Sequence, residues 1–133
     1  MASARQRILV LGGSGFVGRH VCEQLVRAGH QVTVPTRRAN RAACVQTLPG
    51  LTVLENRSFD EEASLVRLLT GHDAVVNLIA VLHGNAQRFE EVHVQLPVRI
   101  ATAMQNAGVR RVVHVSALGA DPQGPSMYQR SKA

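Results

Sequence analysis

Ile8-Leu-Val-Leu-Gly12-Gly-Ser-Gly15-Phe-Val-Gly18 is the stretch that decides the fold of this chain. An apolar run typical of a β-strand gives way to glycines at every third position, and an amphipathic helix pattern follows directly. Such a turn brings backbone N–H groups against a diphosphate at a helix N-terminus, where the helix dipole also favours negative charge. We expect Gly12 to form the tight turn, Gly15 to admit the ligand, and Gly18 to let the helix pack closely on its strand.

Strand and helix patterns alternate along the rest of the chain. Strands are expected over residues 8–11, 31–34, 51–54, 74–80 and 112–115, and the run at 74–80 has the continuous apolar character of a central strand. Crossover connections between parallel strands are right-handed. The sequence therefore predicts an α/β fold, a Rossmann-type doubly wound parallel sheet with strand order 3-2-1-4-5, with cofactors bound at the carboxyl ends of the strands.

The expected helices have recognisable starts and faces. The first covers residues 16–28 with an apolar face at Val17, Val21 and Leu25, and a weaker one lies near residues 38–47. Ser58-Phe-Asp-Glu61 has the spacing of a capping box for the next helix. A long helix over residues 87–107 contains Pro97, which should kink it. The apolar stripe of the helix after residue 61 consists of Leu65, Leu68 and Leu69, and Gly71 ends it.

Size and composition exclude several classes of protein. The 133 residues fit one domain, 45% of them are hydrophobic, and no run approaches the ~20 apolar residues of a membrane helix. Cys22 and Cys44 lack metal-ligand spacing and are expected to be reduced thiols in an intracellular protein. The six histidines are scattered, so we expect no metal site.

The net charge of +6 comes almost wholly from arginine, since Lys132 is the only lysine. A basic surface of this kind can attract nucleic acid. The arginines are spread along the chain, however, and three Phe and one Tyr offer little stacking surface for bases. We therefore attribute the charge to an anionic cofactor and a solvated basic face, and nucleic-acid binding is a minor hypothesis.

A second group of candidate residues lies near the end of the chain. Ser126 and Gln129 have capping-box spacing, which places Tyr128 and Lys132 on one face of a short helix. A nearby ammonium favours a tyrosine phenolate, and a phenol so placed can exchange protons. Ser116, directly after the fifth strand, could bind a substrate oxygen. The alternative is an ordinary helix surface, because i,i+4 pairs are common.

These motifs together resemble the short-chain dehydrogenase/reductase superfamily in its extended and atypical branches. The resemblance rests on the glycine turn, on Val113-His-Val-Ser116 and on Tyr128-x-x-x-Lys132, and it covers essentially the whole chain. Three further segments are similar to one subgroup, the dehydrogenase-like accessory subunit of respiratory complex I and its bacterial relatives. These segments are Val76-Asn-Leu-Ile-Ala80, Val92-His-Val94 and Ser116-Ala-Leu-Gly-Ala-Asp121.

The resemblance implies an NAD(P)-binding Rossmann domain over residues 1–133, the N-terminal part of a longer protein. Tyr128 would be the catalytic acid/base, Lys132 would favour its phenolate and hold the nicotinamide ribose, and Ser116 would orient the substrate. Extended members commonly carry asparagine where this chain has His93, which departs from the family pattern. The expected cofactor contacts are Gly12, Ser14, Gly15, Phe16, Val17, Gly18, Thr36, Arg37, Arg38, Asn56 (for adenine), Leu78 and Ile79.

The end of the second strand favours NADP(H) over NAD(H). An NAD-preferring site carries Asp or Glu there to bind the ribose hydroxyls. This chain reads Val34-Pro-Thr-Arg37-Arg38, without an acid, and a guanidinium would attract the 2′-phosphate of NADP. The alternative is that both arginines solvate a loop.

Two functions are consistent with these residues. The first is an NADP(H)-binding oxidoreductase or epimerase that transfers hydride with Tyr128 as acid/base, although this segment alone is expected to be inactive because the pocket lacks its other wall. The second is a non-catalytic accessory subunit of a respiratory complex with structural NADPH. The substrate stays unidentified, and a redox-sensing role has no positive support. We expect a cytoplasmic protein, which a partner could hold at the inner face of a membrane.

Overall fold

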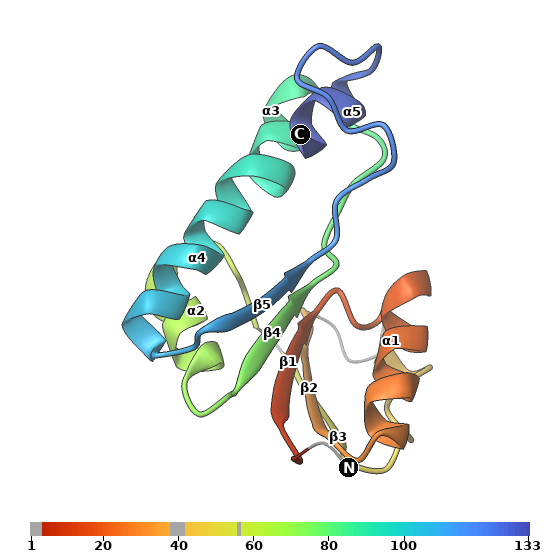
Figure 1. The fold of residues 1–133 in the computed structure, drawn as a ribbon, viewed down its shortest axis with the longest axis vertical. Coiled ribbons are helices and arrows are strands. Elements are labelled where there is room, and N and C mark those ends of the chain that lie inside the picture. The colour runs from red at the N-terminus through yellow and green to blue at the C-terminus, as the bar shows by residue number, and fades with distance from the viewer. Residues whose placement is uncertain (1–3, 38–41, 56) are drawn as a thin grey trace.

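A five-stranded parallel sheet forms the centre of the computed structural model, which describes residues 4–37, 42–55 and 57–133 (Figure 1). The strand order is β3-β2-β1-β4-β5. The predicted order and the doubly wound α/β class are therefore confirmed. The strands are β1 (Arg7–Leu11), β2 (Gln31–Pro35), β3 (Leu51–Leu54), β4 (Ala74–Asn77) and β5 (Arg111–His114).

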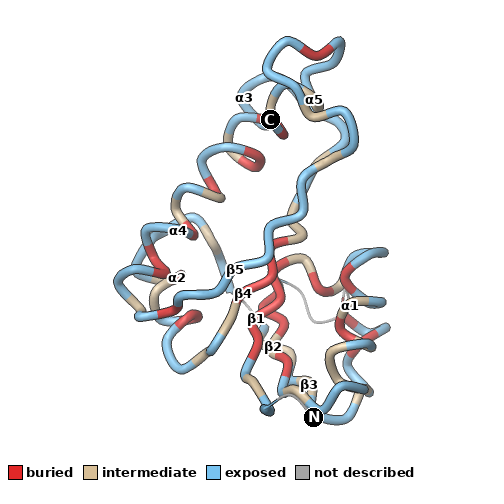
Figure 2. The backbone as a smooth tube through the Cα atoms, in the orientation of Figure 1, coloured by how far each residue is buried: buried red, intermediate tan, exposed pale blue. Residues whose placement is uncertain are grey.

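Helices cover both faces of this sheet. Helix α1 (Phe16–Arg27) lies on one face, and α2 (Glu62–Leu69) and α4 (Leu96–Ala107) lie together on the other (Figure 1). Buried residues concentrate along β1 and its neighbours, whereas β5 is exposed along its length (Figure 2). Among the described residues, no helix combines the length and the apolar character that crossing a membrane requires.

Each face of the sheet has its own apolar core. The core beside α2 and α4 includes Leu9, Leu11, Leu65, Leu69, Val75, Leu96 and Ile100. The core beside α1 includes Ile8, Val10, Cys22, Val32, Val34 and Val45. Alternate residues of β1 point to opposite faces, so this one strand supplies side chains to both cores.

The predicted apolar face of α1 is confirmed at Val21 and Leu25, which pack against the core, and is wrong at Val17. Val17 is 54% exposed, and the fully buried positions are Gly18 and Cys22, with Val21 only partly buried. A Cβ at Gly18 would collide with the Gly12 carbonyl oxygen. The helix therefore turns its glycine, rather than its valine, towards the strand, because only a bare backbone fits there.

Three other elements depart from the sequence prediction. Residues 43–47 form turns instead of the weak helix expected over 38–47, residue 42 is in 3-10 conformation, and residues 38–41 lie outside the described residues. The capping box at Ser58 is absent, since Glu61 precedes α2 and Ser58 Oγ accepts from the Asp60 backbone N–H at 3.2 Å within the loop. Strand β4 ends at Asn77, whose Oδ1 accepts from the Ile79 N–H at 3.2 Å and so replaces a strand partner.

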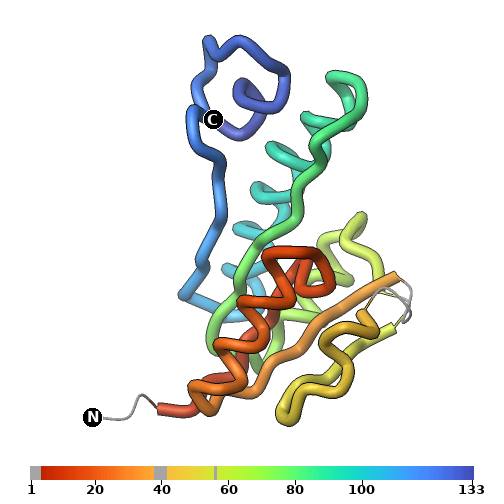
Figure 3. Tube along the Cα trace, turned by 90° about the vertical axis from the view of Figure 1, so that its right-hand side faces the viewer, coloured from red at the N-terminus to blue at the C-terminus, as the bar shows by residue number. Residues whose placement is uncertain are grey.

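The long helix expected over residues 87–107 contains a π-helical segment. Helix α3 (Ala86–Glu90), the π-helix η2 (Glu91–Gln95) and α4 follow one another without a break, and their continuous path is visible in Figure 3. Pro97 lies in the first turn of α4. Because proline lacks an N–H, it cannot bond to the carbonyl of His93, and the wider π turn lies directly before it.

Helix α5 (Met127–Lys132) is attached to η2 through His93. Ser126 caps α5 as predicted, because its Oγ accepts from the Gln129 N–H at 3.1 Å. His93 Nδ1 lies 2.7 Å from Ser131 Oγ, and the Ser131 hydroxyl donates to the Tyr128 carbonyl at 3.0 Å. The helix that carries Tyr128 is therefore held by a side chain from the opposite helix.

The hydrogen bonds of His93 determine its protonation. Its Nε2 lies 3.0 Å from the backbone N of Val81, which can only donate, so Nε2 carries no proton. The remaining proton is on Nδ1 and points to Ser131 Oγ. Burial lowers the pKa of His93, and the positive charges of Lys132 and His114 lower it further. The fold therefore stabilises the neutral form of the His93 imidazole.

The contact at Gly18 predicts a difference between two glycine variants. Gly18→Ala should lower the free energy of unfolding by about 1–3 kcal/mol, because the new Cβ forces α1 away from the turn. Gly15→Ala is the matched control: its Cβ would lie 3.5 Å from the Gly12 carbonyl oxygen at φ −79°, and we expect a change within about 0.5 kcal/mol. Urea unfolding measures both. Equal losses in the two variants would contradict the packing argument.

The neutral His93 predicts that stability falls with acid. Unfolded histidine takes up a proton near pH 6.5 (about its ordinary value), whereas the lowered pKa of folded His93 resists this, so stability is complete above that pH and declines below it. The pKa values of His72 and His114 are also lowered, chiefly by desolvation, and add to the same decline.

The measurement is the urea midpoint at pH 7 and pH 5. His93→Asn should reduce the decline between the two pH values, and the exposed His83→Asn should leave it as in the unmodified chain. A decline in His93→Asn as large as that of the unmodified chain would show that His93 does not contribute.

Candidate functional site

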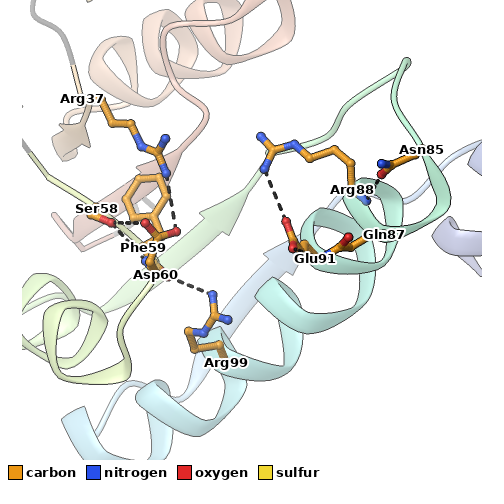
Figure 4. Close-up of polar contacts among 9 residues, drawn as sticks. All are labelled: Arg37, Ser58, Phe59, Asp60, Asn85, Gln87, Arg88, Glu91 and Arg99. Carbon is orange, nitrogen blue, oxygen red and sulfur yellow. Dashed lines mark hydrogen bonds and ion pairs between the residues drawn. The ribbon is translucent and has the colours of Figure 1, made fainter.

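A cavity of about 490 Å³ opens at the carboxyl ends of β1, β2 and β4. Five of the predicted cofactor residues line it together: Gly12, Ser14, Thr36, Arg37 and Ile79. Its other wall is formed by the loop before α2 and by one face of the α3–η2–α4 helix, part of which Figure 4 shows. The remaining lining residues are Pro35, Phe59, Asp60, Arg88, Glu91, Val92, Gln95, Leu96 and Arg99.

The glycine turn forms one side of this cavity. Gly12 has φ +84°, and a Cβ there would lie 3.1 Å from the Leu78 carbonyl carbon and 3.2 Å from the Ile79 nitrogen. The Gly15 N–H donates to the Gly12 carbonyl at 3.2 Å and closes the turn. At Gly15 itself a Cβ would make only ordinary contact with the protein. The packing of this chain therefore explains the glycine at 12 but not the one at 15.

The N-terminus of α1 presents backbone donors to a ligand. Gly15 is its N-cap, and no side-chain cap hydrogen bond is found there among the residues that the structure describes. The N–H groups at the start of a helix have no partners within the helix, so they are available to an anion. The uncapped helix and the glycine at position 15 both fit a diphosphate group at this turn.

The other predicted cofactor residues lie in different surroundings. Phe16 and Val17 are 73% and 54% exposed at the start of α1, and Gly18 is buried beneath the turn. The Leu78 N–H donates to the Leu11 carbonyl at 2.9 Å, and its side chain packs against the core beside α1. Arg38 and Asn56 lie outside the described residues, so their contacts stay predictions.

The wall opposite the turn carries charged residues that the sequence analysis missed. Arg88 Nη1 lies 3.8 Å from Glu91 Oε2, and Arg99 Nη1 donates to the Phe59 carbonyl at 3.0 Å (Figure 4). Positions 88, 91, 92, 95, 96 and 99 recur at helical spacing, so they occupy one face of the long helix. The sequence contained this helical spacing, but it did not show which face of the long helix is directed towards the cavity.

Ser116, Tyr128 and Lys132 form a separate cluster with His93. Ser116 Oγ donates to the Lys132 carbonyl at 3.0 Å, and Lys132 Nζ donates to the Val115 carbonyl at 2.8 Å. Burial lowers the pKa of Lys132, whose exposed fraction is 8%. The half-buried Tyr128 ring lies edge-on to the His93 ring, with 5.4 Å between centroids. The structure thus brings the three predicted residues into one region.

Segment η2 connects this cluster to the cavity. Val92 lines the cavity, and the next residue, His93, contacts both Ser131 and Tyr128. A displacement of η2 would therefore affect both groups of residues. The two candidate sites are neighbours through this one turn of helix.

Asn77 is a further buried polar residue that the sequence analysis did not single out. It is 2% exposed, its Nδ2 donates to His114 Nδ1 at 3.1 Å, and its Oδ1 accepts from the Ile79 N–H. These bonds connect the ends of β4 and β5 and direct the chain into the cavity wall at Ile79. A single polar residue within the apolar run 74–80 was its only sequence signal.

Comparisons with known proteins agree with this geometry. A family profile described as NAD(P)H-binding matches residues 12–133. The mitochondrial "NADH dehydrogenase [ubiquinone] 1 alpha subcomplex subunit 9" of Mus musculus is 36% identical over 93% of this chain and 34% of its own length. An isoflavone reductase homolog of Zea mays is 30% identical over all of this chain and 42% of its own length. The chain thus spans roughly a third to two fifths of the length of these curated relatives.

A solved structure also shares the fold. The dTDP-glucose 4,6-dehydratase of Streptomyces venezuelae, a double mutant with NAD bound, superposes with a TM-score of 0.77 at 27% identity. The superposition covers 95% of this chain and 48% of that one. Because the family match extends over nearly all of its length, the chain belongs to the NAD(P)H-binding family.

Proposed function

We propose that this chain binds NADP(H) in the cavity between β1 and the α3–η2–α4 helix. The observation that carries the proposal is the uncapped N-terminus of α1 next to a glycine that protein packing does not require. Backbone N–H groups there would hold the diphosphate, assisted by the helix dipole. Gly12 and Ser14 line the same cavity as Thr36 and Arg37, so the two ends of an adenosine diphosphate would contact adjoining walls.

The preference for the 2′-phosphorylated cofactor rests on Arg37. It lies two residues after the end of β2, lines the cavity and has a side chain 62% exposed, so its guanidinium is accessible to a ligand. A guanidinium pairs with phosphate through several hydrogen bonds, and the end of β2 carries no acid to repel it. Arg38 would add to this attraction.

The same cluster that holds α5 would provide proton chemistry. The bound nicotinamide would supply or accept a hydride, which makes the chain an oxidoreductase or an epimerase. Tyr128 would give or take the accompanying proton at its phenolic oxygen, and Ser116 would orient the substrate oxygen. Lys132 would favour the phenolate and bind the ribose once its ammonium leaves the Val115 carbonyl.

A second function is favoured by a specific observation. Ser116 and Lys132 are both engaged with main-chain carbonyls in the structure, and such bonds suit a structural role for the cluster. Subunits of mitochondrial NADH dehydrogenase from several organisms are among the relatives at 30–36% identity. The alternative is therefore an accessory subunit of a respiratory complex in which NADPH is bound but not consumed.

Nucleotide binding can be tested separately from folding. Calorimetric titration of the chain with NADPH should detect binding. Gly15→Ala should lower the NADPH affinity by about tenfold or more, because the added Cβ occupies the space of the diphosphate. Gly15→Ala should keep the unfolding midpoint of the unmodified chain. Gly50→Ala, in the turn before β3, serves as a binding control. Full affinity in Gly15→Ala would refute the placement of the diphosphate.

The two functions differ in what happens to the bound cofactor. In the full-length protein loaded with NADPH, carbonyl or quinone substrates should oxidise the cofactor, and absorbance at 340 nm follows this reaction. Tyr128→Phe should slow it by about 100-fold or more while leaving NADPH affinity unchanged, because only the proton donor is lost. Tight retention of NADPH without consumption would support the accessory subunit instead.

A further inference from the structure

Asp60 places a carboxylate beside the arginine that would read the 2′-phosphate. It lies in the loop between β3 and α2 and lines the same cavity as Thr36 and Arg37. Its Oδ1 lies 3.5 Å from Arg37 Nη2, and the two side chains point towards each other (Figure 4). The acid that is missing at the end of β2 is therefore supplied by the next loop.

Local hydrogen bonds hold this carboxylate in place. Ser58 Oγ donates to Asp60 Oδ2 at 2.8 Å, and the Asp60 N–H donates back to Ser58 Oγ at 3.2 Å. Both carboxylate oxygens therefore have a partner, one in the loop and one on Arg37. The apparent capping box at Ser58 thus has another role, which is to orient Asp60 towards the cavity.

The loop that carries Asp60 is attached to the elements on either side of it. Phe59 packs against the core beside α2 and α4, and its carbonyl accepts from Arg99 Nη1 at 3.0 Å. The Arg57 N–H donates to the Thr36 carbonyl at 3.1 Å, which ties the loop to the end of β2. Although the Asp60 side chain is 74% exposed, its backbone is fixed relative to Arg37.

A carboxylate at this place acts on the two cofactors in opposite directions. It can accept hydrogen bonds from the ribose hydroxyls of an unphosphorylated nucleotide, as an acid at the end of the second strand does. A 2′-phosphate would have to displace it from Arg37 and would remain close to a like charge. Arg37 attracts that same phosphate, so the pair combines one favourable and one unfavourable charge.

We propose that Asp60 is a specificity-determining residue that restrains the preference of Arg37 for the 2′-phosphorylated cofactor. The inference rests on the proposed binding of the nucleotide in this cavity. An exposed ion pair adds little to stability by itself. The pair of Asp60 and Arg37 would instead set the ratio of the NADPH and NADH affinities. Arg37 on its own would give a stronger preference than the chain has.

The test is titration of the full chain with NADPH and with NADH. Asp60→Asn keeps the shape of the side chain and removes its charge, and it should raise the ratio of NADPH to NADH affinity by about tenfold. Ser58→Ala should shift the ratio in the same direction but less, since it only releases Asp60. Glu61→Gln, the same charge change one residue further on and outside the cavity lining, should leave the ratio within about twofold of the unmodified chain.

The outcomes separate this inference from the proposed function. If both nucleotides bind and Asp60→Asn leaves the ratio unchanged, or moves it towards NADH, Asp60 does not restrain the preference although the cavity is the nucleotide site. An equal shift in Glu61→Gln would reduce the effect to general surface charge and overturn the inference as well. If neither nucleotide binds the unmodified chain, both the inference and the proposed function fail. Thermal unfolding of each variant checks that the fold is kept.

Discussion

The parallel direction of all five strands is the constraint on which the site depends. Every loop that follows a strand emerges at the same edge of the sheet, because no strand is reversed. At β1 the chain continues into α1 on one face, and at β4 it continues towards the α3–η2–α4 helix on the other (Figures 1 and 3). The two connections diverge, and the cavity lies where they separate.

Much of the fold follows from local sequence patterns. Apolar runs identified the five strands, and the glycine turn indicated which of them is central. The cap at Ser126 depended on neighbouring residues alone and was predicted correctly. The exposure of Val17 was not predicted, although Val21, Leu25 and Gly18 pack as expected, because the close approach of Gly18 to the Gly12 carbonyl decides which residues of the first turn face the strand.

The side of the cavity formed by the glycine turn and the end of β2 was predictable from the sequence, and the side formed by the loop before α2 and the long helix was not. The turn and the residues after β2 lie next to a strand end, where the topology fixes their position in advance. Asp60, Arg88 and Arg99 reach the cavity only through the packing of a loop and a helix. Ser58 is an example: its spacing is that of a cap, yet its Oγ accepts a hydrogen bond from the Asp60 N–H within the loop. Local patterns cannot decide such competition between partners.

The glycines of the turn are required for two separate reasons. At Gly12 and Gly18 a side chain would strike the chain's own backbone, so these positions belong to the assembly of the first strand–helix–strand unit. At Gly15 a Cβ would make only ordinary contact with the Gly12 carbonyl oxygen, so packing does not exclude a side chain there. A descendant that lost its ligand would still be selected to keep two of the three residues. Retention of Gly12 and Gly18 in a homologue therefore indicates only that the fold is kept. Substitution of Gly15 would be the sign that nucleotide binding has been lost.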